Sequence, residues 1–170
     1  MEQLAESLGA PSYRGRQLAS WICTRGVVDP EAMSDLPKDF RQALGERAVV
    51  EVPELEREMP SADGSRKLVF ALSGGSRISA VLMPDDERIT LCVSTQVGCG
   101  FACGFCLTGV MGLERNLTAG EIVGQVLAAN RLLEEGRRAT HIVFMGMGEP
   151  RADYAAGVKG VRVPTGPKPG

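Results

Sequence analysis

The chain has 170 residues, an apolar fraction of 44% and a formal net charge of −2, which suits one ordinary domain, or a small domain with part of a larger one. The slight acidity argues against a broad basic field for binding nucleic acids. Since no apolar run approaches the roughly 20 residues of a membrane span and the N-terminus has no signal-peptide core, we expect a cytoplasmic protein with no membrane partner.

Residues 1–48 are predicted to form a small helical N-terminal accessory domain. Two apolar stripes recur there at helical spacing. Their members are Leu18, Trp21 and Ile22, and then Leu36, Phe40 and Leu44. Six basic and seven acidic residues share the segment, so the charges are interpreted as solvated helix faces rather than a phosphate-binding surface. Cys23 is interpreted as an inert core residue.

From residue 49 the pattern changes to β. Apolar segments at residues 67–73, 77–83 and 89–95 are separated by turn sequences rich in Gly, Pro, Ser and Asp. We therefore predict an antiparallel meander. Residues 49–88 would link the helical domain to a core that begins at residue 89.

A helix and a strand are predicted after the cysteines. Thr118 and Glu121 fit a capping box, an apolar stripe follows, and Gly136 marks the helix end. Residues 141–146 are a nearly continuous apolar run, typical of a strand buried on both sides of a parallel sheet. With strand 89–95 these elements make one right-handed βαβ unit, which would open an α/β barrel or a doubly wound sheet.

The end of the chain, residues 155–170, is predicted to be an irregular tail. Residues 157–170 contain four Gly and three Pro without periodicity, so they supply no further strands. A single βαβ unit leaves its sheet edges unpaired. We therefore expect a fragment whose core, residues 89–154, is cut off or read out of frame after about Tyr154.

Four of the five cysteines lie between Cys92 and Cys106. Cys99, Cys103 and Cys106 have the spacing C-x3-C-x2-C, which is expected to turn three sulfurs of one loop toward one point. Soft thiolates without a neighbouring His or carboxylate favour an iron–sulfur cluster or zinc. Structural zinc sites and ordinary clusters take four protein ligands. Three thiolates would therefore leave one iron of a cubane cluster open to a small molecule.

Cys92 is expected on the strand that precedes this loop. Two other interpretations of the cysteines stay open: a zinc knuckle completed by Cys92 or His141, and buried cysteines without a ligand. The zinc knuckle would make the chain a nucleic-acid-binding protein and not an enzyme. The open cluster is the interpretation that we favour.

A second motif, GMGEP at residues 146–150, follows the last predicted strand. Ligands of parallel α/β folds gather where the carboxyl ends of strands meet their loops. Gly146 and Gly148 would let a ligand approach the backbone, and Glu149 offers an acceptor for a cationic amine. A plain glycine-rich turn is the alternative. Because both motifs follow strands of one βαβ unit, we expect them on the same rim, where they would form a cofactor pocket.

These residues resemble radical S-adenosylmethionine enzymes and, more narrowly, the RNA adenine methyltransferases of the RlmN/Cfr group, which methylate carbon 2 or carbon 8 of an adenine. The matching segments include LCVSTQVGCGFACGFCLTG, ERNLTAGEIVGQV and VFMGMGEP. The resemblance covers roughly residues 10 to 154. It implies an α/β fold in which a small helical N-terminal domain and a β meander lead into the first βαβ unit of a partial, truncated radical-SAM (β/α) barrel.

The RlmN branch is the better match, and it implies methylation of adenine carbon 2 in 23S ribosomal RNA and in some transfer RNAs. Cys99, Cys103 and Cys106 would hold a 4Fe-4S cluster, whose open iron S-adenosyl-L-methionine would chelate. Gly148 and Glu149 would contact the methionine portion of that cofactor. An electron donor such as a flavodoxin-type protein is implied as a partner, and a monomer is favoured.

The resemblance also assigns Cys92 and exposes two departures from the family pattern. In the family, a cysteine near the C-terminus carries the methyl group to the adenine, and the cysteine matching Cys92 then attacks its sulfur and frees the product. No cysteine follows Cys106 here, so we expect these 170 residues alone to be inactive. Ser79 replaces a glutamate thought to remove the adenine proton, which serine cannot do near neutral pH without a partner base. A radical S-adenosylmethionine enzyme with another substrate is the second enzyme hypothesis.

Overall fold

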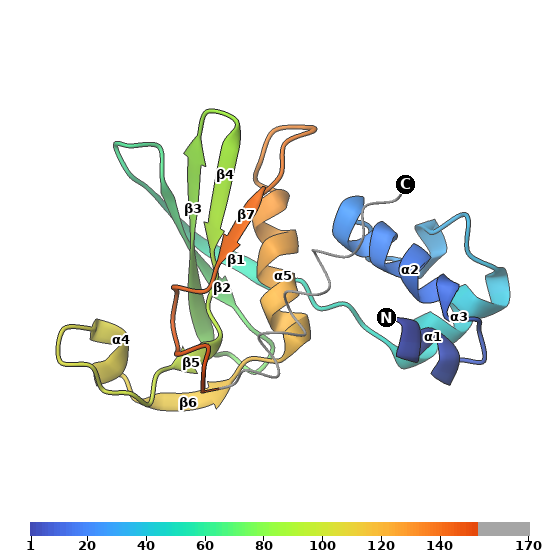
Figure 1. Ribbon diagram of the computed structural model, residues 1–170, viewed down its shortest axis with the longest axis horizontal. Helices are drawn as coiled ribbons and strands as arrows, with labels where there is room; N and C mark the ends of the chain where they lie inside the picture. The colour runs from blue at the N-terminus through green and yellow to red at the C-terminus, as the bar shows by residue number, and fades with distance from the viewer. Residues whose placement is uncertain (153–170) are drawn as a thin grey trace. The chain divides into compact units, whose positions relative to one another are not determined.

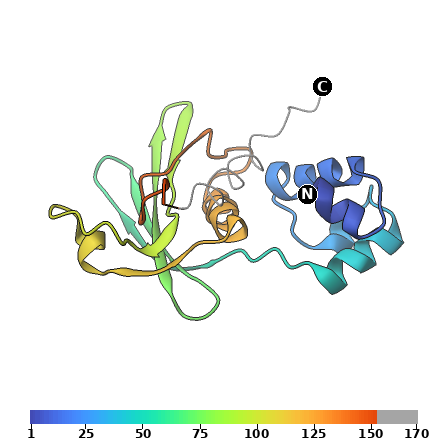
Figure 2. The ribbon, with the colours of Figure 1, turned by 60° about the horizontal axis from the view of Figure 1, so that its bottom comes forward.

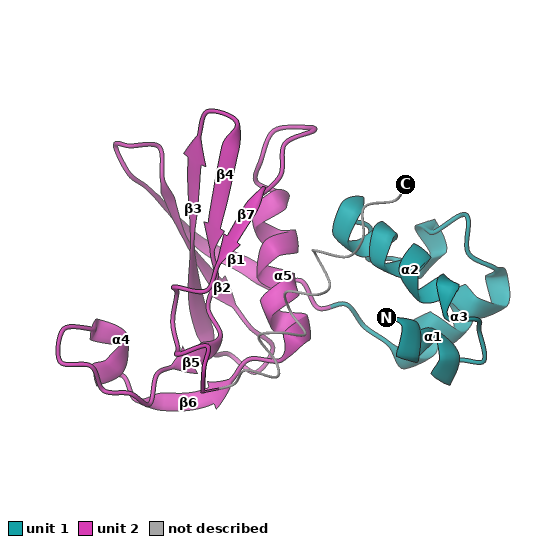
Figure 3. Ribbon diagram, in the orientation of Figure 1, with its two compact units in different colours: residues 1–50, 161–170 teal, residues 51–160 magenta. Residues whose placement is uncertain are grey.

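The computed structural model describes residues 1–152, so the predicted tail at residues 155–170 lies outside the described part. The chain divides into two compact units, shown in separate colours in Figure 3. Residues 1–50 make the first unit, and the described part of the second begins at Glu51. Within residues 1–152, no helix has the length and the apolar character needed to span a membrane.

The first unit is helical, as predicted (Figure 1). It contains helices α1 (Glu2–Ser7), α2 (Tyr13–Ala19) and α3 (Lys38–Arg47), a π-helical turn (Ser20–Thr24) and a 3-10 turn (Pro30–Ala32). Every member of the two predicted stripes is buried, together with Ala5 and Met33. Cys23 is half-buried and not a core residue, but burial raises the pKa of its thiol to about 11, which fits an inert cysteine.

The second unit is built on one five-stranded mixed sheet. Its strand order is β1 (Glu54–Pro60), β2 (Arg66–Ala71), β3 (Arg77–Asp85), β4 (Arg88–Cys92) and β7 (His141–Val143). Strands β1 to β4 are antiparallel neighbours, whereas β7 joins β4 in parallel with Cys92 opposite Val143. The α/β class, the meander and the βαβ unit are therefore confirmed. Strand β4 belongs both to the meander and to the βαβ unit.

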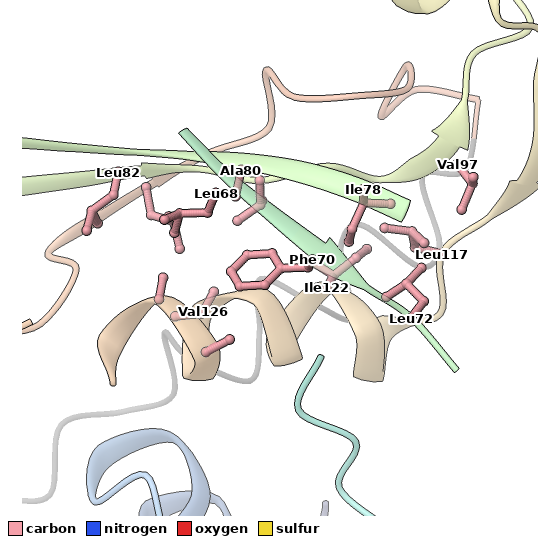
Figure 4. Packing of buried hydrophobic residues seen from close by; sticks show 14 of the residues in the cluster. Leu68, Phe70, Leu72, Ile78, Ala80, Leu82, Val97, Leu117, Ile122 and Val126 are labelled. Carbon is pink, nitrogen blue, oxygen red and sulfur yellow. The ribbon is translucent and has the colours of Figure 1, made fainter. Parts of the chain in front are cut away.

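A single apolar core lies between this sheet and helix α5 (Ala119–Asn130), which Figure 2 views nearly end-on. Figure 4 shows the strand side chains that point toward the helix. They include Leu68, Phe70, Ile78, Ala80 and Leu82, all buried. Because side chains alternate between the faces of a strand, the residues between them, such as Ser79 and Val81, lie on the other face and are half-buried.

Three strands were not predicted. Strand β1 has the polar sequence ELEREMP and is mostly exposed, because it is an edge strand with no buried face to impose alternation. Strands β5 (Gln96–Gly98) and β6 (Leu113–Asn116) form a separate antiparallel pair. Strands of three or four residues are too short to give a periodic signal.

Helix α5 is shorter and more completely buried than predicted. Its capping box at Thr118 and Glu121 is present. The helix ends at Asn130, not at Gly136, and the Asn130 side chain instead accepts a hydrogen bond of 2.8 Å from the Ala139 backbone N–H. The predicted apolar stripe is buried within the helix, but so is every other residue from 121 to 129.

The last strand also differs from its prediction. Strand β7 covers only His141–Val143, and His141 is exposed while the other two residues are half-buried. The prediction of a strand buried on both sides is wrong, because β7 pairs only with β4 and forms an edge of the sheet among the described residues. The His141 Nδ1 atom lies 2.9 Å from the Thr140 hydroxyl.

Candidate cofactor site at the ends of two parallel strands

The two sequence motifs meet at one end of the parallel β4–β7 pair. The Val93 N–H donates to the Val143 carbonyl at 2.9 Å, and the Gly146 N–H donates back to the Val93 carbonyl at 3.1 Å. The Thr95 N–H then donates to the Met147 carbonyl at 2.9 Å. The segment that leads into the cysteine loop therefore runs beside the GMGEP turn, as expected for parallel strands.

The GMGEP turn depends on a glycine at position 148. Gly148 has a φ of +102°, and a Cβ built there would lie 2.7 Å from the Cβ and Cγ of Gln96 and from the Thr95 hydroxyl. Any side chain would meet both strain and a clash. The turn carries Glu149, whose carboxylate accepts a hydrogen bond of 3.1 Å from the Arg151 N–H. Since this carboxylate forms no ion pair within residues 1–152, it can accept a cationic amine.

A buried serine, Ser94, is hydrogen-bonded to the GMGEP turn. Ser94 is fully buried; its hydroxyl donates to the Ser79 carbonyl at 2.6 Å and accepts from the Met147 N–H at 2.9 Å. The Gln125 side chain of α5 bonds to the Ser94 backbone and not to the turn: it accepts from the Ser94 N–H at 2.9 Å and donates to the Ser94 carbonyl at 3.0 Å. Buried polar groups that are fully hydrogen-bonded hold one arrangement of a core.

Thr95 and Gln96 are also buried beneath the turn. The Thr95 hydroxyl has no hydrogen-bond partner in the described part of the chain, which costs about 1–3 kcal/mol for a buried polar group. Residues 94–96 were not singled out as site residues from the sequence. The available signal was three consecutive polar residues, Ser-Thr-Gln, directly after an apolar strand.

The cysteine loop begins at a close approach of two backbones. The Cys99 N–H donates to the Gly112 carbonyl at 2.9 Å, and a Cβ at Gly98 would lie only 1.8 Å from that oxygen. Between these ends the loop, with the short helix α4 (Leu107–Val110), projects away from the sheet (Figures 1 and 2). Its large apolar side chains are exposed: Phe101, Phe105, Leu107, Val110 and Met111.

The three loop thiols are free and unequal. Cys99 and Cys106 are half-buried, and Cys103 is exposed. The Gly109 and Thr108 backbone N–H groups lower the pKa of the Cys106 thiol. The expected turn of all three sulfurs toward one point is not found: no three His, Cys, Asp or Glu side chains in residues 1–152 are arranged to hold a metal ion.

The chemistry of the donor set nevertheless fits an iron–sulfur cluster. Residues 99–112 contain three thiols and no charged side chain or histidine, so no hard ligand competes with sulfur. A thiol whose thiolate form is stabilised, such as Cys106, is ready to bind a metal. The assignment of Cys99, Cys103 and Cys106 as ligands stays a prediction.

Cys92 differs from the accessible, partly ionised thiol expected of an attacking residue. It lies at the end of β4 with 8% exposure. Burial raises the pKa of its thiol, and a hydrogen bond with the Met145 backbone N–H opposes this only in part. Cys92 pairs with Val81 on β3, and Ser79 is two residues from Val81 on the same strand. Cys92 and Ser79 therefore both lie on the sheet face that α5 does not cover.

Comparison with known proteins gives the same assignment along most of the chain. Residues 1–50 match the family model of the ribosomal RNA large subunit methyltransferase N-terminal domain. The "Dual-specificity RNA methyltransferase RlmN" of Halorhodospira halophila is 46% identical over 158 residues, covering 93% of this chain and 44% of that protein. The "Probable dual-specificity RNA methyltransferase RlmN" of Moorella thermoacetica is also 46% identical, covering 96% of this chain and 48% of that protein.

A solved structure extends the likeness to three dimensions. The crystal structure of a radical SAM methyltransferase from Sphaerobacter thermophilus matches with a TM-score of 0.81 and 46% identity, covering 95% of this chain and 48% of that one. The chain spans less than half the length of the relatives named above. The resemblance predicted from the sequence is confirmed: over most of its own length the chain is similar to the RlmN RNA methyltransferases.

Proposed function

We propose that the chain is the cofactor-binding part of a radical S-adenosylmethionine methyltransferase that acts on adenine carbon 2 in ribosomal RNA and transfer RNA. One observation carries this proposal: the GMGEP turn is hydrogen-bonded to residues 93–96, which lead directly into the cysteine loop, at one end of the β4–β7 pair. The names of the RlmN relatives support the RNA substrate. The proposed setting is the cytoplasm, with a flavodoxin-type electron donor and a monomeric protein.

Each of the two motifs would bind one cofactor. Cys99, Cys103 and Cys106 would hold a 4Fe-4S cluster, and Gly148 and Glu149 would contact the methionine portion of S-adenosylmethionine. When bound, the cluster would supply the electron that splits the sulfonium of S-adenosylmethionine. The Glu149 carboxylate would hold the cofactor's amino group.

Cys92 is proposed to free the product by attacking the cysteine sulfur that is bonded to the new carbon on the adenine. The sulfur–carbon bond would break as the disulfide forms, and the carbon would keep the electron pair, take up a proton and stay on the adenine as its methyl group. Burial raises the pKa of Cys92, so its proton must be removed or its surroundings must open before it attacks. Ser79 is half-buried on the same face. A serine hydroxyl is no base near neutral pH, so another group must take the adenine proton.

The domain assignment follows the same proposal. Residues 1–48 would be the accessory domain, residues 49–88 the link, and residues 89–154 the start of a partial radical-SAM barrel. The division of the structure after Val50 and the family-model match to residues 1–50 support the first boundary. The second boundary would fall within a continuous sheet, because β4 pairs with both β3 and β7.

The proposal is tested with the cluster-reconstituted chain, S-adenosylmethionine and dithionite. We expect binding of S-adenosylmethionine and slow reductive cleavage to 5′-deoxyadenosine. We expect no 2-methyladenosine in added RNA, because no cysteine follows Cys106. Glu149→Gln should weaken binding, whereas the exposed Glu135→Gln should not. A chain that neither binds nor cleaves S-adenosylmethionine contradicts the proposal.

A further inference from the structure

We infer that Gln96 is a positioning residue that fixes the Gly148–Glu149 turn relative to the cysteine loop. Gln96 lies on β5, three positions before Cys99, and is only 2% exposed. The inference rests on the proposed function, in which the turn contacts S-adenosylmethionine and the loop holds the cluster. In that function, the distance between the turn and the loop determines whether the bound S-adenosylmethionine can reach the cluster.

The side-chain amide of Gln96 bridges two segments. Its Oε1 accepts a hydrogen bond of 3.1 Å from the Glu149 backbone N–H, and its Nε2 donates to Asn116 Oδ1 at 2.7 Å. The orientation of the amide follows from chemistry, because a backbone N–H can only donate. Oε1 must therefore face Glu149, and Nε2 must face Asn116.

These two partners belong to the two halves of the site. Asn116 ends β6, where it pairs with Gln96, and the β5–β6 pair closes the base of the cysteine loop. Glu149 belongs to the turn after β7. The Gln96 backbone N–H adds a third bond, to the Met147 carbonyl at 3.2 Å. Gln96 is thus bonded to the turn and to the base of the loop at once.

Packing adds a steric constraint to these hydrogen bonds. The Cβ and Cγ of Gln96 lie 2.7 Å from the position that a Cβ would take at Gly148, so the stem of the glutamine lies directly against the turn. Asparagine is one methylene shorter and would not reach the Glu149 N–H. Methionine would fill a similar volume but leave this N–H without its acceptor.

A matched control separates positioning from simple stabilisation. Gln125 is also a fully buried glutamine whose amide bonds to backbone groups, those of Ser94, and it has no hydrogen bond to residues 148–149. Gln96→Met and Gln125→Met should both lower stability. Only the first should change the behaviour of the Glu149 amide and the affinity for S-adenosylmethionine.

The first measurement is the rate of hydrogen exchange at the Glu149 backbone amide in the whole chain without cofactors. Wild type and variants are compared under conditions in which their free energies of unfolding are equal. Gln96→Met should speed this exchange about tenfold, the factor that one hydrogen bond supplies, while Gln125→Met leaves it unchanged. Gln96→Glu should keep it slow, because its carboxylate still accepts from Glu149 and Asn116 can turn its amide. If Gln96→Met does not fold, Gln96→Asn carries the same expectation.

The second measurement is S-adenosylmethionine affinity of the cluster-reconstituted chain by calorimetry. Gln96→Met should raise the Kd about tenfold, and Gln125→Met should change it less than about twofold. Equal effects of the two variants on exchange and on Kd would overturn the inference. A wild-type chain that binds no S-adenosylmethionine, while its Glu149 exchange still depends on Gln96, would overturn the proposed function and leave the positioning of the turn supported.

Discussion

Substitution of Gly148 by alanine tests whether the GMGEP turn is held as the structure shows. The new Cβ would sit 2.7 Å from the Gln96 stem and from the Thr95 hydroxyl, on a backbone with a φ of +102°. Both neighbours are buried, so neither can swing into solvent to make room. The substitution therefore combines a conformational cost with a packing cost.

The two costs can be estimated separately. An L-residue at positive φ costs about 1–2 kcal/mol, and overpacking a tight core site costs about 1–3 kcal/mol. We expect Gly148→Ala to lower the free energy of unfolding by about 3 kcal/mol, a large part of the roughly 5–15 kcal/mol of a typical domain. For a unit of this size the melting temperature should fall by roughly 15 °C.

Urea and thermal unfolding of the whole chain measure this effect, and Gly136→Ala provides the control. Gly136 has a φ of +81° with no atom within 4 Å of a built Cβ, so it reports the conformational cost alone, about 1–2 kcal/mol. The difference between the variants is the packing cost. If Gly148→Ala is no more destabilising than Gly136→Ala, the turn does not lie against Gln96 and Thr95 as described.

Three further predictions concern buried and ionisable groups. Thr95→Val should leave stability unchanged or raise it by about 1 kcal/mol, because it removes a buried hydroxyl without a partner; a clear loss in urea unfolding would mean that the hydroxyl is bonded. Burial opposes ionisation of Glu121, but the Arg115 guanidinium and the capping hydrogen bonds prevail and lower its pKa. Its contribution to stability should therefore be present above the unfolded value of about 4.3 and be lost as the pH falls through the lower folded value. In unfolding curves at several pH values, Glu121→Gln should weaken this acid sensitivity, and an unchanged pH profile would contradict the ion pair. Iodoacetamide at pH 8 should modify Cys106, whose pKa backbone N–H groups lower, before Cys23, whose pKa burial raises to about 11; mass spectrometry showing the reverse order would refute this.

The sequence was informative where one periodicity governs a segment. The stripe of Leu18, Trp21 and Ile22 is buried as its spacing predicts, and the turn sequences separate the antiparallel strands as expected. The Thr118 cap is also correct, because a capping box is a local signal. These features depend on neighbours within a few residues.

Features set by contacts between distant segments could not be read in this way. Gln125 lies on a helix that is buried on all sides, because both the sheet and the backbone near Glu51 pack against it. Gln96 becomes a bridge only once the segment after β7 passes beside it, 53 residues later. From the sequence alone, a polar residue at the end of a strand is expected to be exposed to solvent.

The candidate site shows the same division. The shared rim of the cysteine loop and the Gly148 turn follows from strand order, and the hydrogen bonds confirm it. The spacing of Cys99, Cys103 and Cys106 identifies candidate ligands but does not fix where their side chains point. That direction depends on a loop whose apolar side chains are largely exposed.

The measurement that tests the central claim most directly is anaerobic iron and sulfide reconstitution, followed by ultraviolet–visible and electron paramagnetic resonance spectra with and without S-adenosylmethionine. We predict a 4Fe-4S spectrum that S-adenosylmethionine perturbs. It should be lost in Cys103→Ala and retained in Cys23→Ala, which removes a cysteine outside the loop. One tightly bound zinc per chain and no cluster would contradict the radical mechanism and favour a zinc knuckle, and failure to bind either metal would contradict the assignment of the three thiols as ligands.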